Sequence, residues 1–559
     1  MLRIYYSMSP QTNKLINYLL IFSIFLYLLS FILHPITAIT QDLGRHLKVG
    51  EIILKTGNVP KTNLLTYTYP DFSFINHHWL SEVVFFATFQ VGNFGLLLFC
   101  KILLIFLSFG LIFWLALKKS SLLTAGLFSF IFLAVFQERT ELRPEVLSFL
   151  FFAVYLFVLQ NFSEKNKKWL WLLPIIQLLW VNSHIYFFVG PVLYLFFVID
   201  QLIKKRLKIS KTIIFVGLLI IMANFVNPNG LTGAFYPLKV FENYGYQIVE
   251  NKSPFFLEQY FGVTSRAILF FKISLGLLIV GFIINLRKIS YFNLLISIFL
   301  SFMAIKAVRN FPLFALGTLP IVCQNYEELI KKLLKRIKTK KFDIYAALKI
   351  GLVIFYLWQA SIFISNSWCR NNNSNKCFSW GIIDGPQKAG DFIVDNKISG
   401  PMFNNFDVGS FLEYRVWPKK AFVDGRPEAF PHSFFSEVYI PMQERPEVWN
   451  EISLKFDFNY IFFSHTDQTP WAQVFLKNIS QNKNWVLVYL NDWAVIYLKN
   501  NEKNQDIINK FALNSKNAVL KTFPQGKDYL YFLRLGRFFS LIGWQEAGRL
   551  SMQKSQILK

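Results

Sequence analysis

Long apolar runs separated by short basic segments limit most strongly how this chain can fold. Hydrophobic residues make up 54% of its 559 residues and only 16% are charged, whereas about a quarter is usual in soluble proteins. Inside a bilayer an unpaired backbone group costs several kcal/mol, so an apolar run that crosses it must be helical. The sequence therefore predicts a polytopic α-helical membrane protein.

A spanning helix needs about 20 mostly apolar residues, and we expect about 11 of them. They lie near residues 14–33, 94–117, 121–137, 144–160, 169–183, 185–203, 212–226, 267–286, 290–305, 311–324 and 345–364. The first run is longer than the core of a signal peptide, and no small-residue cleavage site follows it. It is therefore predicted to be a retained membrane helix.

Basic residues gather in the loops that follow every second predicted span. The clusters are residues 118–119, 165–168, 204–211, 287–288 and 331–341. Since cytoplasmic loops carry the excess of Lys and Arg, the N-terminus is predicted to be cytoplasmic and the tail after Ser365 periplasmic or extracellular. These clusters also explain the net charge of +25 through contacts with anionic lipids, so no nucleic-acid partner is expected.

The chain is predicted to form three regions. A transmembrane module covers residues 1–365, and its first outside loop, 34–93, carries interfacial helices. Residues 366–500 alternate turns with strand-like aromatic and β-branched runs, which is typical of an external α/β domain. Residues 501–559 are predicted to be helical and to end in a hairpin that resembles a single tetratricopeptide unit, although such repeats need neighbours to bury their faces.

Two of the four cysteines lie close together in a polar stretch outside the spans. Cys369 and Cys377 are expected to form a disulfide if that stretch faces an oxidising compartment. The sequence has no CxxC pair and no zinc-ligand spacing, so no zinc site is predicted.

Asp42 lies a few residues beyond the first predicted span, in the motif QDLGRH. A carboxylate at the membrane surface is suited to act as a general base, or to hold a divalent cation against a lipid phosphate. The alternative is structural, because Asp at the start of a helix accepts hydrogen bonds from its first N–H groups. Position alone favours this capping role.

His77, His78 and Glu82 belong to the motif NHHWLSE. His78 and Glu82 are four residues apart and share a helix face, and histidine titrates near neutral pH. The cluster is suited to phosphate binding or proton transfer. It is equally suited to a belt of amphipathic residues at the membrane interface.

Charged and polar residues also mark the outer mouths of later spans, where they are functional candidates by default. Arg139, Arg143 and Glu145 lie in ERTELRPE, where an arginine can clamp a phosphate through two parallel hydrogen bonds. His184 follows a tight outer turn, and Arg309 occupies another mouth. Each residue taken alone is also explained as part of a solvated turn, where ion pairs contribute little to stability. Together they converge on one side of the membrane.

In the tail, Asp424 and Arg426 belong to the motif VDGRPE. A glycine and a proline flank the arginine and predict a sharp turn. Arg426 would bind an anion there or form a structural ion pair with Asp407 or Glu413, and we favour the structural pairing.

Together these features resemble the GT-C superfamily of membrane glycosyltransferases, which includes oligosaccharyltransferases, protein O-mannosyltransferases and aminoarabinose transferases. Its members have many spans, an acid in a long first outside loop and often an external C-terminal domain. The stretches DLGRHLKVGEIILKTGNVP, HHWLSEVVFF, RPEVLSF, WVNSH and VDGRPE are similar to a bacterial subgroup related to polyprenyl-phosphate-sugar-dependent mannosyltransferases. No WWDYG-like acceptor motif is present, which argues against an oligosaccharyltransferase.

The resemblance implies transfer of a sugar from a polyprenyl-phosphate-linked donor to a glycan, lipid or protein, at the outer face of the inner (plasma) membrane. Asp42 would deprotonate or orient the acceptor or hold Mg²⁺ or Mn²⁺, and Glu145 would be a second catalytic acid. No DxD is present, which argues against a metal cofactor. Arg143, Arg309 and His78 would stabilise the departing phosphate. The other residues assigned to substrate or phosphate binding are Arg45, His46, His77, Glu82, Arg139 and His184.

Two other functions stay open. A transporter or flippase of lipid-linked or small solutes would favour ionisable groups near the bilayer midplane and internal repeats, and the sequence shows neither. A non-catalytic scaffold for envelope assembly would use the tail as its binding module, which the tetratricopeptide-like end favours. No P-loop, GxGxxG or serine nucleophile elbow is present, so nucleotide-driven transport is not expected.

Overall fold

The computed structural model describes residues 9–37, 42–204, 210–239, 244–337 and 343–559. These residues are mostly helical and include a four-stranded sheet. The chain divides into two compact units. Unit 1 comprises Met1–Pro35, Gly92–Val240 and Ile248–Trp380, and unit 2 comprises Ile36–Val91, Phe241–Gln247 and Gly381–Lys559.

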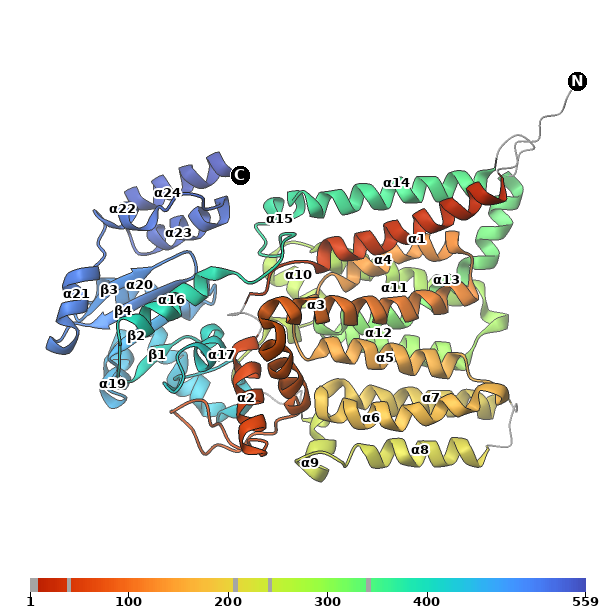
Figure 1. Ribbon diagram of the computed structural model, residues 1–559, viewed down its shortest axis with the longest axis horizontal. Coiled ribbons are helices and arrows are strands. Elements are labelled where there is room, and N and C mark those ends of the chain that lie inside the picture. Colours follow the sequence, from red (N-terminus) through yellow and green to blue (C-terminus); the bar gives the residue numbers. More distant parts are fainter. Residues whose placement is uncertain (1–8, 38–41, 205–209, 240–243, 338–342) are drawn as a thin grey trace, which may run out of the picture. The chain divides into compact units, whose positions relative to one another are not determined.

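Unit 1 is a bundle of apolar helices that run side by side (Figure 1). Its longer helices are α1 (Pro10–Ile32), the second part of α3 (Trp79–Lys119), α4 (Leu122–Phe136), α5 (Glu145–Gln160), α6 (Leu172–Ser183), α7 (Val189–Ile203), α8 (Lys211–Ala223), α11 (Arg266–Ile284), α12 (Tyr291–Lys306), α13 (Phe311–Ile337) and α14 (Ile344–Ile364). Shorter ones are η1 (Glu164–Trp171), η2 (Ile185–Phe188), α9 (Gly230–Ala234), η3 (Tyr236–Leu238), η4 (Val249–Asn251), α10 (Pro254–Phe261), η5 (Leu286–Lys288), η6 (Val308–Asn310) and α15 (Ser367–Asn371). α1 packs against α14, and α4 packs against α13.

Among the described residues, five helical segments are long and apolar enough to cross a membrane: α1, α3, Ile185–Ile203, α11 and α14. The helices α4, α5, α8 and α12 are also apolar but shorter. Large apolar side chains such as Phe22, Phe215 and Trp358 are exposed along these helices, which is typical of a surface that faces lipid. The chain is a multi-pass membrane protein, and the number of about 11 spans stays a prediction.

Helix α3 is interrupted at Gly92 and Asn93. Their φ/ψ angles of −146°/25° and 52°/−155° are not helical. Residues before the break belong to unit 2 and those after it to unit 1. The break lies where the sequence separates an interfacial segment from a membrane span.

Unit 2 is built around the sheet. Its strands are β1 (Met402–Asn404), β2 (Tyr460–Ser464), β3 (Trp485–Leu490) and β4 (Ala494–Lys499), in the order β1-β2-β4-β3. β1 and β2 are parallel, and the other pairs are antiparallel. The helices are α2 (Leu43–Thr56), the first part of α3, α16 (Asp384–Asp395), α17 (Phe406–Arg415), η7 (Pro427–Ala429), η8 (Phe434–Tyr439), α18 (Pro441–Glu444), α19 (Pro446–Lys455), α20 (Pro470–Gln481), η9 (Glu502–Asn504), α21 (Gln505–Phe511), α22 (Ala518–Thr522), α23 (Tyr529–Leu541) and α24 (Gln545–Leu558).

The two faces of the sheet form two hydrophobic cores. Ile461 and Phe463 belong to one core, and Tyr460 and Phe462 belong to the other, because successive side chains of a strand point to opposite faces. All five residues of β2 are buried, as is usual for a strand covered on both faces.

The segment between the first two membrane helices packs into this unit. Thr66 forms a β-bridge with Ala421, and the hydroxyl of Tyr67 donates to the carbonyl of Met402 at 2.6 Å. Phe74 lies in the same core as the strand residue Ile461. These contacts fix α2 against α17, and this packing positions the side chains described next.

Candidate functional site

Asp42 precedes α2 but does not cap it with its side chain. It adopts a left-handed conformation (φ 54°, ψ 11°) and makes no hydrogen bond to the first N–H groups of the helix. Its Oδ1 instead accepts a hydrogen bond from Ser410 Oγ of α17 at 2.9 Å. The carboxylate is therefore held by the tail of the chain, which argues against a side-chain capping role.

The turn at Gly425 lies directly against this pair. Its N–H donates to Ser410 Oγ at 3.3 Å, and a Cβ atom added to Gly425 would lie 2.3 Å from Asp42 Oδ1. α2 and α17 also approach closely, since a Cβ on Gly44 would lie 2.4 Å from the carbonyl oxygen of Ser410. Only glycine leaves room for these approaches, so the backbone itself shapes the surroundings of Asp42.

Asp407 interacts with two other carboxyls of unit 2, those of Asp42 and Asp467. Burial and the negative charges of Asp467 and Asp42 raise the pKa of Asp407. The Asp407 side chain is also exposed to solvent, which weakens the effects of burial and of the neighbouring charges alike. Asp467 is buried and accepts a hydrogen bond from Asn405 at 2.9 Å. Repulsion from its two neighbours therefore favours the protonated form of Asp407.

The pair of Asp424 and Arg426 is internal to the unit. Arg426 Nε lies 3.1 Å from both oxygens of Asp424, and its Nη2 donates to Asn63 Oδ1 at 2.7 Å. Its guanidinium also lies 4.8 Å from the ring centre of Phe74. Both ionic side chains are almost completely buried. This arrangement favours the structural role over anion binding.

Glu413 lies beside this ion pair and is completely buried. Burial and the negative charge of Asp424 raise the pKa of Glu413 well above its ordinary value. Burial opposes ionisation of Asp424 as well, but Arg426 holds the pKa of that carboxyl low. Of these two buried carboxyls, Asp424 is therefore the one that favours the ionised form and Glu413 the one that favours the protonated form.

The carboxylate of Glu82 joins α2 to α3. Its Oε1 lies 3.3 Å from Arg45 Nη1 and 3.0 Å from His46 Nδ1, and its Oε2 accepts from Asn76 at 2.6 Å. Burial and the charge of Arg45 lower the pKa of His46, so the imidazole is neutral and donates through Nδ1. The buried cluster holds the two helices together.

The two histidines of NHHWLSE lie next to that cluster. The His78 ring centre is 3.9 Å from that of His77 and 5.6 Å from that of His46. Both His77 and His78 are partly buried. Helical spacing pairs His78 with Glu82, but the hydrogen-bond partners found for that carboxylate are Arg45, His46 and Asn76.

In unit 1, three arginines converge on Glu250. Arg139 donates to Glu250, and also to Glu145 through Nε and Nη2 at 2.9 and 3.1 Å. Arg143 Nη1 donates to Glu250 at 3.1 Å. Burial would raise the pKa of Glu250, but the charges of Arg139, Arg143 and Arg309 hold it well below its ordinary value. Arg139 is fully engaged, whereas the side chain of Arg143 is 21% exposed.

Arg309 is connected to the same loop. Its Nη1 donates to Asn251 Oδ1 at 2.8 Å, and its carbonyl accepts from the Tyr186 hydroxyl at 3.1 Å. His184 is buried at the start of η2, and its Nδ1 accepts from the Tyr186 N–H at 3.4 Å and contacts Ser148 Oγ at 3.0 Å. His184 therefore shapes this turn.

Reasoning from the sequence missed Ser410 and Glu250. A serine inside a helix carries no local signal, and its partner Asp42 is 368 residues away. Glu250 stands in a loop of mixed charge. The one available signal was that buried arginines need carboxylate partners.

In the part of the chain that the structure describes, no group of three or more His, Cys, Asp or Glu residues is arranged so that it could hold a metal ion. The Oδ1 atom of Asp42 already accepts from Ser410. A requirement for a divalent cation therefore stays a prediction from the sequence.

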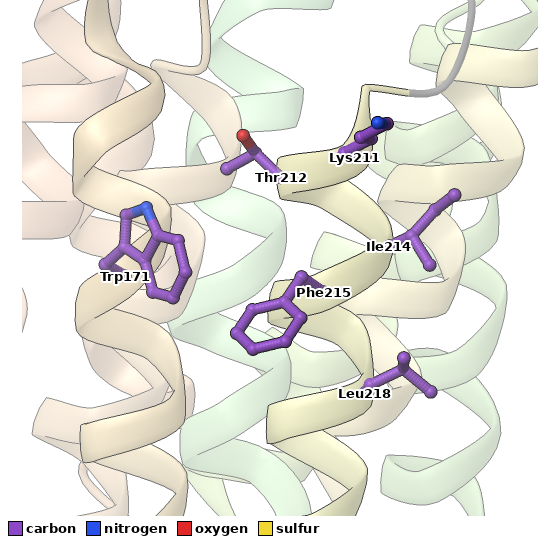
Figure 2. A pocket seen from close by; sticks show the side chains of 6 residues that line it. All are labelled: Trp171, Lys211, Thr212, Ile214, Phe215 and Leu218. Atoms are coloured by element: carbon purple, nitrogen blue, oxygen red, sulfur yellow. The ribbon is translucent and has the colours of Figure 1, made fainter.

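A pocket of about 370 Å³ lies along α8 (Figure 2). Trp171, Lys211, Thr212, Ile214, Phe215 and Leu218 line it. None of the candidate residues is among them, and the lining is mostly apolar.

Cys369 and Cys377 are joined by a disulfide, with their Cα atoms 5.1 Å apart. It closes a short loop directly after α14, in unit 1.

No protein-family model and no curated protein matches the sequence. The archaeal oligosaccharyltransferase AglB from Archaeoglobus fulgidus, in its apo form, aligns with a TM-score of 0.57 and 12% identity over 84% of this chain and 72% of AglB. AglB in complex with an inhibitory peptide and a dolichol-phosphate aligns with a TM-score of 0.54 and 11% identity, over 86% and 74% of the two chains.

ArnT from Cupriavidus metallidurans, bound to undecaprenyl phosphate, aligns at 12% identity over 87% of this chain and 98% of ArnT, with a TM-score of 0.47. That score is too low to establish a common fold. The likeness to AglB concerns the fold alone, because so few residues are identical. The fold that the predicted resemblance implies is thus confirmed by the likeness to the oligosaccharyltransferase AglB.

Proposed function

We propose that the protein is an integral membrane glycosyltransferase that moves a sugar from a polyprenyl-phosphate-linked donor to a glycan, lipid or protein acceptor at the outer face of the membrane. The observation that carries the proposal is the carboxylate of Asp42. It precedes an amphipathic helix, makes no capping bond and is held by Ser410. A carboxylate kept available in this way is suited to accept a proton.

The fold supports the choice of substrates. AglB, which shares the fold, forms a complex with a dolichol-phosphate and an inhibitory peptide. We therefore assign a lipid phosphate as the leaving group. The acceptor stays a broad class, because this chain has no WWDYG motif.

In the proposed reaction, Asp42 accepts the proton of an acceptor hydroxyl while the hydroxyl oxygen attacks the anomeric carbon. The bond between that carbon and the phosphate oxygen breaks, and its electron pair leaves with the polyprenyl phosphate. Direct displacement inverts the anomeric centre. No step is assigned to a metal ion.

The departing phosphate also needs positive charge, because preorganised charge at a developing anion is usually the largest catalytic contribution. The assignment of Arg143 and Arg309 to this role stays a prediction from the sequence. Glu145 and Glu250 hold Arg139 in place. His77 and His78 stay candidates for contacts with the lipid phosphate.

The test is to incubate the purified protein with a panel of polyprenyl-phosphate sugars and membrane extract, and to measure release of the lipid phosphate. We expect release that Asp42→Asn abolishes without loss of folded protein. The matched control is Asp457→Asn, the same change at a carboxyl whose side chain is 84% exposed. Undiminished release by Asp42→Asn would remove Asp42 from this role. If folded wild-type protein releases nothing from any donor, the transporter and scaffold functions become the better hypotheses.

A further inference from the structure

The hydroxyl of Ser410 is completely buried, so its hydrogen bonds are made within the protein. It lies 2.9 Å from Asp42 Oδ1 and 3.3 Å from the backbone nitrogen of Gly425. An N–H group only donates and an ionised carboxylate only accepts. Ser410 therefore accepts from Gly425 and donates its single proton to Asp42.

This chain of hydrogen bonds fixes one rotamer of Ser410 and one orientation of Asp42. Ser410 is the hydrogen-bond partner found for that carboxylate among the described residues. The backbone of Asp42 contributes strain, because its φ of 54° lies in the left-handed region, which residues with side chains seldom adopt.

The turn that carries Gly425 is itself held firmly. The N–H of Arg426 donates to Asp424 Oδ1 at 2.9 Å, and the buried ion pair of these two residues borders Gly425 on both sides. A Cβ added to Gly409, on α17, would lie 2.0 Å from the carbonyl oxygen of Val423. Ser410 thus stands between a rigid turn and a carboxylate that has no other anchor in the described residues.

We propose that Ser410 is a positioning residue, which holds the carboxylate of Asp42 in the orientation that accepts the acceptor proton. This inference rests on the proposed function for its kinetic consequences. Its structural content does not depend on activity. The C-terminal region of the chain thereby supplies a group that orients the acid of the first outside loop.

The kinetic test compares wild type with Ser410→Ala, Ser410→Cys and Ser551→Ala. Cysteine keeps the shape of serine but donates weakly, and Ser551 is a buried serine of α24 whose hydroxyl bonds only to its own helix, at Ala547. Since misplacing a reacting group by about 1 Å can cost about 100-fold, we expect Ser410→Ala to lower kcat by about 10- to 100-fold with KM for the donor unchanged. The kcat of Ser410→Cys should lie between those of wild type and Ser410→Ala. Ser551→Ala should keep the wild-type kcat.

The split between kcat and KM gives a readout that a loss of folded protein would not produce, because a misplaced carboxylate slows the chemical step without weakening donor binding. Equal kcat in wild type and Ser410→Ala would overturn the proposal.

A second measurement is independent of catalysis. A water-soluble carbodiimide with an amine nucleophile labels carboxyl groups, and mass spectrometry gives the labelling rate of Asp42. We expect Ser410→Ala to change this rate several-fold and Ser551→Ala to leave it unchanged. A changed rate in a protein without transferase activity would support the positioning role while refuting the proposed function. An unchanged rate in Ser410→Ala would refute the positioning role itself.

Discussion

Replacing Gly425 with alanine tests the surroundings of Asp42 most directly. The added Cβ would lie 2.3 Å from Asp42 Oδ1, 3.1 Å from Ser410 Oγ and 3.3 Å from Asp42 Cγ, whereas ordinary contacts begin at 3.4 Å. The carboxylate must therefore retreat by about 1.1 Å. Gly425 does not have a positive φ, so alanine fits the backbone and the effect is steric.

The size of the effect follows from what the carboxylate loses. A hydrogen bond to a charged group contributes about 1.5–3 kcal/mol, which corresponds to a rate factor of about 10–150 if the bond is needed in the transition state. Displacement by about 1 Å costs a similar factor. We expect Gly425→Ala to lower kcat for lipid-phosphate release by about 100-fold, with a stability loss of about 1–3 kcal/mol from overpacking.

The assay is release of the lipid phosphate by the purified variant, together with thermal unfolding in the same detergent. The control is Gly351→Ala in α14, where an added Cβ would meet nothing within 4 Å. Wild-type activity in Gly425→Ala, or an equal loss of activity in Gly351→Ala, would refute this prediction.

Three further predictions concern stability. Glu413 has a raised pKa in the folded protein, so wild-type stability should decline as pH rises above the ordinary carboxyl range. Glu413→Gln mimics the protonated form and should flatten this decline, measured by thermal unfolding from pH 5 to 9. Glu250→Gln removes the carboxylate partner of Arg139 and Arg143 and should lower the free energy of unfolding by about 1–3 kcal/mol. The control Glu328→Gln, at an exposed ion pair, should leave Tm unchanged. Equal Tm values for the two variants would contradict a stabilising role of Glu250. Cys377→Ser opens a loop with a sequence separation of 8 and should cost about 2–3 kcal/mol, measured as a lower Tm that reductant reproduces in wild type.

Some of this structure could be predicted from the sequence because it depends on local patterns. Apolar runs indicate membrane helices. The predicted change from an interfacial segment to a membrane span near residue 92 coincides with the break in α3. Asp42 was recognised as a candidate because it follows a membrane helix. Its alternative role, capping, was also a local expectation, and it gave way to a contact with Ser410 that sequence spacing cannot reveal.

The rest depends on contacts between distant residues. Glu82 shares a helix face with His78 but accepts hydrogen bonds from Arg45 and His46 of a different helix. Helical periodicity predicts which residues share a face, but it does not predict which neighbouring element that face meets. Glu250 illustrates the same limit, because its role follows from arginines that lie more than a hundred residues earlier.

The packing of unit 2 also bears on the choice between an enzyme and a scaffold. An appended binding module would fold around its own core and leave the first outside loop to the membrane helices. Here Phe74 of that loop lies in a core with strand residues of the tail, and Ser410 of the tail holds Asp42. A tail that served only to bind partners would have no need to orient a carboxylate 368 residues away. The arrangement therefore favours a tail that is part of the reacting site.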